Sequence, residues 1–198
     1  MKICFFGGTF NPVHNGHVRL LENAKEYFGF DKIIVIPTNI PPHKEVVFSV
    51  SDDDRLNMCK LAFDGMAEVS DYEIRENTIS YTINTMHHFK EIYPNDEFYF
   101  LMGSDMLFMF EKWKNYKELI SLISVVVASR EDNELESLEN KKAELEIDGA
   151  RIYIIKAEPY VVSSSMIRNM IKSGEKDFSC YLPERVVEYI LDKKLYLE

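Results

Sequence analysis

The sequence predicts a doubly wound α/β fold, in which helices cover both faces of a parallel β-sheet. Short runs of apolar, largely β-branched residues recur along the chain, as expected of strands buried on both sides. Segments with helical spacing of apolar residues separate these runs. The chain has 198 residues, 46% of them hydrophobic, and no repeat or flexible linker divides it. We therefore expect a single domain over residues 1–198.

The first predicted unit is a strand, a glycine-containing loop and a helix. The apolar run at residues 1–6 stops at a Gly-Gly pair, as a buried strand before a tight loop does. Apolar residues then follow helical spacing from Val18 to Phe28, and Gly29 ends the helix. The next strand is the apolar run 32–37. Two strands joined through one helix predict a right-handed parallel crossover.

The same alternation continues to the end of the chain. Ser51 followed by Asp54 predicts a helix start of the capping-box type, and we place a further strand within 67–74. Pro183 predicts the start of the last helix. The residues of that helix predicted to face inward are Val187, Ile190 and Leu191. The remaining predicted elements are a helix at 81–93, strands at 97–102, 124–129 and 151–156, and a helix that opens at 163–165.

Charge and apolar patterning disfavour several classes of partner. The chain carries 33 acidic and 23 basic residues, a formal net charge of −10, which argues against binding to nucleic acid or to an anionic membrane surface. No apolar run approaches the roughly 18–20 residues that span a bilayer, and the N-terminus does not resemble a signal peptide. We therefore expect a cytoplasmic protein. Cys4, Cys59 and Cys180 form no C-x-x-C pair and predict buried free thiols.

Residues 131–148 differ in composition from the rest of the chain. They carry eight carboxylates and two lysines on a weak helical pattern of leucines. We interpret them as a solvated surface helix between two strands, without a chemical role.

The stretch 7–17, GGTFNPVHNGH, carries the most chemistry. It follows the first strand, at the sheet edge where ligands bind in open α/β folds, and it leads into a helix N-terminus that attracts anions. His14 and His17 can donate hydrogen bonds to phosphoryl oxygens, while Gly8 lets a phosphate approach the backbone closely. Two glycines after a strand also occur without a phosphate site, and H-x-x-H could be half of a metal site, although no further ligand stands nearby.

Two later segments can reach the same edge of the sheet. Lys44, in the Pro-Pro-His-Lys segment at 41–44, can extend to a phosphate, although loop lysines are more often only solvated. The serines at 163–165 cap a helix whose N–H groups and hydroxyls also suit phosphate, and Arg168 follows one turn later. Because this helix begins just past a strand end, we expect it to face the first loop.

These segments together resemble a known family. The loop 7–17 resembles the G-G-[ST]-F-[DN]-P-x-H-x-G-H signature of the HxGH nucleotidyltransferase superfamily, and SSSMIR at 163–168 resembles its later I-S-S-T-x-[IV]-R signature. The resemblance runs from Lys2 to about Leu195 and implies a Rossmann-like fold. The intermediate motifs look like those of the bacterial nicotinate-nucleotide adenylyltransferases, namely 41–44, 54–56, 80–82, and 103–105 followed by Trp113.

The resemblance implies roles for individual residues. Free N–H groups where Tyr81 and Thr82 start a helix would bind the nicotinate carboxylate, and Trp113 would stack on the pyridine ring. Helices at about 164–195 would complete the ATP site. The implied ATP-binding residues are Gly8, Thr9, Phe10, His14, His17, Asp105, Ser164, Ser165 and Arg168, of which His14, His17 and Arg168 would be catalytic. The implied mononucleotide-binding residues are Gly8, Thr9, Lys44, Tyr81, Thr82 and Trp113.

The reaction that the resemblance implies converts ATP and nicotinate mononucleotide into nicotinate adenine dinucleotide and pyrophosphate, a step of NAD biosynthesis. The acceptor phosphate is already ionised near pH 7, so in-line attack needs no enzyme nucleophile or base. Mg²⁺ would travel mainly on ATP, without metal ligands from the protein. Two alternative functions stay open: a related adenylyltransferase that uses nicotinamide mononucleotide or phosphopantetheine as acceptor, and a nucleotide-binding regulator without turnover. The oligomeric state also stays open, a homo-oligomer included.

Overall fold

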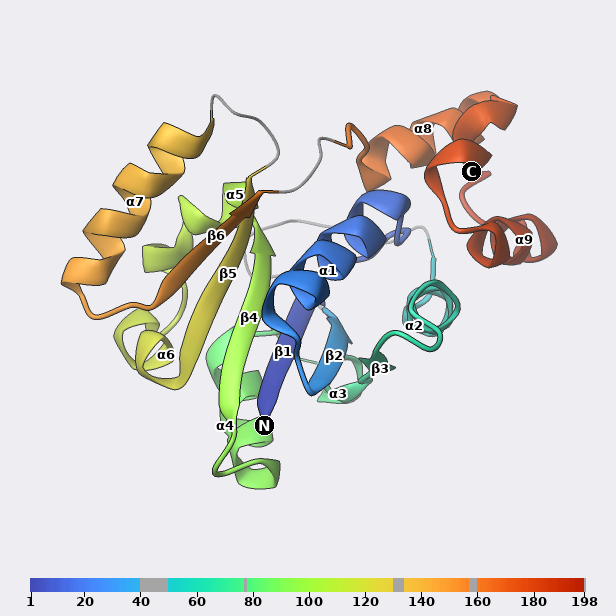
Figure 1. Ribbon diagram of the computed structural model, residues 1–198. Coiled ribbons are helices and arrows are strands. Elements are labelled where there is room, and N and C mark those ends of the chain that lie inside the picture. Colours follow the sequence, from blue (N-terminus) through green and yellow to red (C-terminus); the bar gives the residue numbers. More distant parts are fainter. Residues whose placement is uncertain (40–49, 77, 130–133, 157–159, 198) are drawn as a thin grey trace.

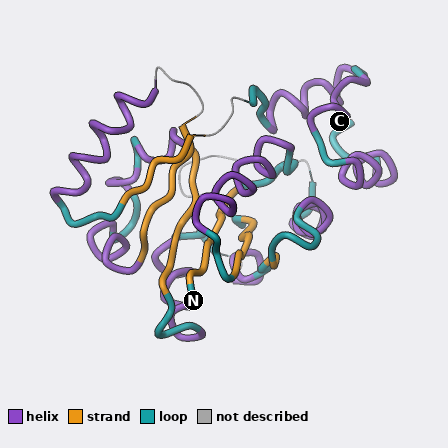
Figure 2. Tube along the Cα trace, in the orientation of Figure 1, coloured by secondary structure: helices purple, strands orange, loops and turns teal. Residues whose placement is uncertain are grey.

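The computed structural model describes residues 1–39, 50–76, 78–129, 134–156 and 160–197, and it contains a six-stranded sheet in the order β3-β2-β1-β4-β5-β6 (Figure 1). All neighbouring strands in this sheet are parallel, and helices lie on both of its sides (Figure 2). The predicted doubly wound fold is therefore confirmed. The strands are β1 (Lys2–Gly8), β2 (Lys32–Pro37), β3 (Glu68–Val69), β4 (Glu97–Gly103), β5 (Ile123–Ser129) and β6 (Ile152–Lys156).

The helices form two layers, and each layer buries its own hydrophobic cluster against the sheet. One cluster joins the sheet to α1, α2, α8 and α9, and the other joins it to α4, α5, α6 and α7. In Figure 1, α1 crosses in front of the strands, and the chain ends beside α8 and α9. The helices are α1 (Asn15–Phe28), α2 (Asp52–Ala62), α3 (Tyr72–Glu76), α4 (Thr82–Ile92), α5 (Ser104–Leu107), α6 (Tyr116–Leu122), α7 (Leu135–Ile147), α8 (Ser164–Ser173) and α9 (Glu184–Lys193), with 3₁₀ turns η1 (Phe110–Lys112) and η3 (Lys176–Tyr181).

Several predicted boundaries match the structure. β2 coincides with the predicted run, and α1 ends at Gly29, whose φ of 57° lies in the left-handed region that favours glycine. Ser51 caps α2 by accepting a hydrogen bond from the N–H of Asp54 at 3.1 Å. Ser163 caps α8 in the same way. At each of these ends, a cap or a backbone requirement marks the boundary in the sequence.

The predicted end of the first strand needs correction, whereas the strand predicted within 67–74 is confirmed over a shorter range. β1 continues through its glycines because its pairing with β2 extends to Gly8 opposite Pro37. Within 67–74, only Glu68–Val69 is a strand, and the helix α3 begins at Tyr72. β3 is an edge strand with two residue pairs to β2, and a window this short fits a strand or a helical turn equally well.

Two burial predictions also need correction. Leu191 is 60% exposed, because Val186 and Ile190, one turn apart, form the buried stripe of α9. Cys180 is an exposed thiol in η3, whereas Cys4 and Cys59 are buried as predicted. Burial raises the pKa of both buried thiols, so they stay protonated and inert.

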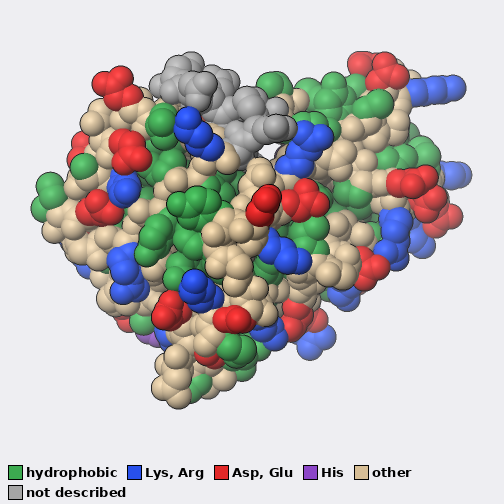
Figure 3. Space-filling model, viewed as in Figure 1, with side chains coloured by type: hydrophobic (Ala, Val, Ile, Leu, Met, Phe, Trp, Pro, Cys, Tyr) green, Lys and Arg blue, Asp and Glu red, His purple; other side chains and the backbone are tan. Residues whose placement is uncertain are grey.

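The described part of the acidic segment forms the predicted surface helix, α7. Leu138 and Leu145 are buried in the cluster under it, while most of its carboxylates are exposed. On the face drawn in Figure 3, the side chains of Lys and Arg are interspersed with those of Asp and Glu. Among the described residues, no helix has the length and apolarity needed to cross a bilayer.

Candidate active site

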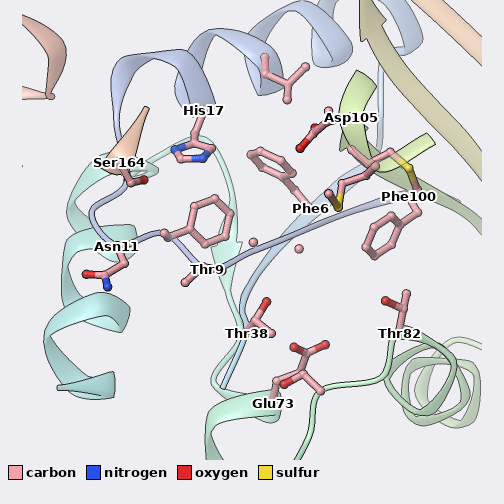
Figure 4. Close-up of a pocket in the computed structure, with 18 of the residues that line it drawn as sticks. Phe6, Thr9, Asn11, His17, Thr38, Glu73, Thr82, Phe100, Asp105 and Ser164 are labelled. Carbon is pink, nitrogen blue, oxygen red and sulfur yellow. The ribbon is translucent and has the colours of Figure 1, made fainter. Parts of the chain in front are cut away.

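A cavity of about 390 Å³ opens at the carboxyl ends of β1 and β4, beside the N-termini of α4 and α8. Its volume is typical of a small-molecule site. Figure 4 shows His17 and Ser164 toward one end and Glu73 and Thr82 toward the other. We call these the loop end (residues 8–11, 17, 164, 165 and 168) and the α4 end (residues 73, 80–82, 113 and 114). The predicted site residues that line the cavity are Gly8, Thr9, Phe10, His17, Tyr81, Thr82, Asp105, Trp113, Ser164, Ser165 and Arg168.

Two predicted residues are not found on the cavity wall. Lys44 lies outside the described residues. His14 is 5% exposed, and its imidazole stacks on that of His17 with 3.7 Å between ring centroids. His14 therefore supports the position of His17 and does not itself line the cavity.

His17 is held at the loop end in a defined orientation. Its Nδ1 accepts a hydrogen bond from the backbone N–H of His14 at 3.2 Å, and Phe10 packs edge-on against its ring. An acceptor at Nδ1 means that the neutral ring carries its proton on Nε2. This arrangement needs a glycine at position 16, because a Cβ there would lie 2.9 Å from Cγ1 of Val162, which is too close for two carbon atoms.

Side chains from α2 and α8 hold three carbonyl groups of the loop at residues 9–12. α2 contributes a fully buried arginine that also pairs with Asp52 at 2.6 Å, and α8 contributes an arginine and a serine. These bonds occupy the carbonyl oxygens that would otherwise repel an anion, and they fix the loop against two helices distant in sequence. They run from Arg55 to the Thr9 oxygen (2.8 Å), from Arg168 to the Asn11 oxygen (2.7 Å) and from Ser164 to the Pro12 oxygen (2.8 Å).

The end of the chain also holds this loop. The hydroxyl of Tyr196 donates a hydrogen bond of 2.7 Å to the side-chain oxygen of Asn11, and both residues are buried. Burial raises the pKa of Tyr196, which keeps its hydroxyl a donor. Neither residue was predicted to be part of the site, because a pair separated by 185 positions leaves no local pattern.

The α4 end combines a helix N-terminus with a buried carboxyl group. Tyr81 occupies the N-cap position of α4 without a capping hydrogen bond from its side chain, and the first N–H groups of α4 have no acceptor within the helix. Glu73, from α3, is 9% exposed and accepts a hydrogen bond from the hydroxyl of Thr85 at 2.6 Å. Burial raises the pKa of Glu73, and the hydroxyls of Thr85 and Ser80 partly offset this rise. Sequence reasoning missed Glu73, because a lone glutamate on a five-residue helix carries no signal.

Aromatic and basic side chains complete the α4 end. The ring of Trp113 stands edge-on to Phe100, at 5.8 Å and 90°, and to Phe110 at 5.2 Å. The ammonium group of Lys114 lies 4.2 Å from the centroid of the Tyr81 ring. Lys114 lines the cavity but was not predicted as a site residue, because a lysine beside a tryptophan in the sequence cannot be told from an ordinary surface lysine.

The described residues offer little support for a metal site built by the protein. They contain no group of three His, Cys, Asp or Glu side chains that could hold an ion. Among the described lining residues, Asp105 and Glu73 carry the carboxylates. The cavity therefore suits a metal that arrives on phosphate oxygens, with at most one or two carboxylates added by the protein.

Comparison with known proteins identifies the class of this chain. Residues 5–170 match the cytidylyltransferase-like family, and the chain belongs to this class of nucleotidyltransferases. A protein of Clostridium botulinum (strain Loch Maree / Type A3) named "probable nicotinate-nucleotide adenylyltransferase" is 38% identical over 194 residues, which is 96% of each chain. A protein of the same name from Clostridium tetani is 36% identical and covers 98% of each. Within its class, the chain belongs to the nicotinate-nucleotide adenylyltransferase family.

A solved structure shares the fold over almost the whole chain. The nicotinic acid mononucleotide adenylyltransferase of Plasmodium falciparum, complexed with NaAD, has a TM-score of 0.80 and covers 98% of this chain and 97% of its own. It is 21% identical in sequence, so the likeness concerns the fold alone.

Proposed function

We propose that this chain transfers AMP from ATP to nicotinate mononucleotide, which gives nicotinate adenine dinucleotide and pyrophosphate in NAD biosynthesis. The observation that carries the proposal is a single cavity with two chemically different ends, one with donors for phosphate and one with a helix N-terminus beside Trp113. A phosphate oxygen of the acceptor attacks the α-phosphorus of ATP in line. The new P–O–P linkage forms while the bond to the β-phosphate oxygen breaks and pyrophosphate leaves.

The loop end would bind and neutralise the triphosphate. His17 would donate a hydrogen bond to the phosphate from Nε2, because its Nδ1 already accepts one. His14 would contribute to catalysis by holding the ring of His17, on which its own ring stacks. Arg168 supplies a permanent positive charge, and Ser164 and Ser165 lie at the N-terminus of α8, which attracts anions. Donors held in place before the reaction stabilise the charge that develops on the leaving pyrophosphate.

The α4 end would bind the acceptor. The N–H groups of Tyr81 and Thr82 suit the nicotinate carboxylate, because they sit at the positive end of the α4 dipole. Trp113 would stack on the pyridine ring, and Lys44, outside the described residues, would reach the mononucleotide phosphate. Between the two ends, the nucleotides would be lined by the backbone of Gly8, Thr9 and Phe10.

Mg²⁺ would be bound mainly by the phosphates of ATP. When bound, it supplies positive charge to the phosphoryl oxygens during the transfer. Asp105, which lines the cavity, would orient ATP through a ribose hydroxyl or through this metal. The small number of carboxylates on the described cavity wall supports a metal that enters with its substrate.

We further propose that residues 1–198 act as one nucleotidyltransferase domain in the cytoplasm. The helices at about 164–195 would complete the ATP site, an idea supported by the position of Ser164, Ser165 and Arg168 on the cavity wall. The partners would be small-molecule substrates. A net charge of −10 makes nucleic acid and anionic membranes unfavourable partners.

The test measures pyrophosphate release from ATP and Mg²⁺ with three acceptors offered one at a time: nicotinate mononucleotide, nicotinamide mononucleotide and phosphopantetheine. We expect the highest kcat/KM with nicotinate mononucleotide, together with nicotinate adenine dinucleotide as the second product. Release with phosphopantetheine alone would contradict the proposal. Binding of ATP without release in the presence of any acceptor would instead indicate a nucleotide-binding regulator.

A further inference from the structure

The two closest candidate acceptors differ by one unit of charge at the α4 end. Nicotinate mononucleotide presents a carboxylate where nicotinamide mononucleotide presents a neutral carboxamide. Backbone N–H groups donate to either oxygen, so the N-terminus of α4 alone distinguishes the two weakly. A positively charged side chain distinguishes them better, because its attraction acts on the net charge of the ligand.

Lys114 is the positive charge that the structure provides at this end. Among the described lining residues, the permanent cations are Lys114 and Arg168. Arg168 is committed to the loop end by its bonds to Asn11 and Ser165. The ammonium of Lys114 instead rests on the ring of Tyr81, 4.2 Å from its centroid, next to the start of α4.

The charge of Lys114 is available to a ligand. No carboxylate in the described ranges lies within ion-pair distance of its ammonium group. The carboxyl group of Glu73, on the wall of the same cavity, is bonded to Thr85. Lys114 is exposed, so its ammonium can swing from the Tyr81 face to an anion at the cavity mouth without breaking an ion pair.

Glu73, on the wall of the same cavity, adds a reason for a cation at the α4 end. When ionised, this buried carboxyl group repels a second carboxylate brought into the same end of the cavity. The positive end of α4 and the ammonium of Lys114 both oppose this repulsion. We propose that Lys114 is a specificity-determining residue that favours an acceptor carrying a carboxylate over one carrying a carboxamide, an inference that rests on the proposed function.

The test compares wild type with Lys114→Met, which keeps the apolar stem and removes the charge, and with Lys114→Arg, which restores a charge. The matched control is Lys112→Met, an exposed lysine two positions earlier that does not line the cavity. Two constants are measured for each variant: KM for nicotinate mononucleotide, and the inhibition constant of nicotinamide mononucleotide, which reports binding without turnover. KM for ATP and the melting temperature are recorded alongside.

For Lys114→Met we expect KM for nicotinate mononucleotide to rise about five-fold or more, the scale of a partly screened ion pair. The inhibition constant, kcat and KM for ATP should change less than two-fold (roughly the scatter of neutral surface changes). Lys114→Arg should retain most of the preference for nicotinate mononucleotide over nicotinamide mononucleotide. Added salt should weaken this preference in wild type more than in Lys114→Met.

Two results would overturn the role of Lys114 while leaving the proposed function intact. One is an unchanged KM in Lys114→Met. The other is an equal rise in KM for nicotinate mononucleotide and in the inhibition constant of nicotinamide mononucleotide. Such a result would mean that Lys114 binds the phosphate that both mononucleotides carry. A wild-type protein that is inert with nicotinate mononucleotide, but active with another acceptor, would instead refute the proposed function and this inference together.

Discussion

The two ends of the cavity are built in different ways. At the loop end, hydrogen bonds from α2, α8 and the C-terminal tail hold four groups of the segment 9–12. At the α4 end, the polar groups are the first turn of one helix, one buried carboxyl group and one exposed lysine. The proposed transition state depends on donors at the loop end that do not move, whereas choosing an acceptor needs only a few groups of the right charge. Substitutions at the two ends should therefore differ in which kinetic constant they change.

The largest effect is expected at the loop end, from His17→Ala. Loss of a donor held in place should lower kcat/KM by roughly 10² or more. The matched control is His87→Ala, on the exposed side of α4, where the ring pairs with Glu118 at 2.8 Å. Steady-state pyrophosphate release at subsaturating ATP measures the effect. Unimpaired turnover of His17→Ala under these conditions would remove His17 from the mechanism.

A smaller effect at the same end should follow from Tyr196→Phe. The substitution keeps a buried ring but removes the hydroxyl that bonds to Asn11, and so leaves a buried amide oxygen without its donor. Such a loss costs about 1–3 kcal/mol of stability. We expect kcat/KM for ATP to fall by about ten-fold, the factor that corresponds to 1.4 kcal/mol, with KM for nicotinate mononucleotide nearly unchanged.

Tyr189→Phe is the control for Tyr196→Phe. Tyr189 bonds through its hydroxyl to Asp54 at 2.9 Å, between α9 and α2 and away from the cavity wall. The variant Tyr189→Phe should lose stability without losing activity. If Tyr196→Phe lost stability but kept its kcat/KM for ATP, as expected of Tyr189→Phe, the C-terminal tail would have no role in positioning the loop.

The contrast between the ends also explains how much the sequence could predict. Most residues of the loop end were predicted, because they lie in one continuous motif directly after β1 or at the serine-rich start of α8. Glu73 belongs to a five-residue helix, and Lys114 lies in the turn between η1 and α6. The positions of both residues depend on tertiary packing. Tyr196 reaches the loop only because α9 packs on the same face of the sheet as α1.

The fold was predictable for a related reason. A buried parallel strand needs an apolar run, and β4 and β5 each match theirs to within one residue. The short helices α3, α5 and α6 were not predicted, because four to seven residues contain too few turns for a periodic pattern. Two of them, α3 and α5, supply Glu73 and Asp105 to the cavity wall, so the missed elements lie close to the site.

The smallest expected effect concerns the buried charge of the α4 end, which Glu73→Gln removes. Burial raises the pKa of Glu73 above its ordinary value of 4.5, so the folded protein holds this proton more tightly than the unfolded chain does. The stability that results is complete below pH 4.5 and is lost as the pH rises through the raised pKa. A glutamine does not ionise and can still bond to the hydroxyl of Thr85. Glu73→Gln should therefore be more stable than wild type at pH 8, by about 2–4 °C in melting temperature for a change of about 1 kcal/mol.

The pH dependence separates this effect from a simple change in packing. The difference in melting temperature between Glu73→Gln and wild type should be constant above the raised pKa of Glu73 and should shrink as the pH falls from that pKa toward 4.5, whereas a packing defect would give a difference independent of pH. Glu76→Gln, on the exposed side of the same helix, should match wild type throughout. A Glu73→Gln variant less stable than wild type at pH 8 would mean that the ionised carboxylate is favoured at the α4 end. The cost of burying the ionised group, which we infer from the raised pKa of Glu73, would then not exist.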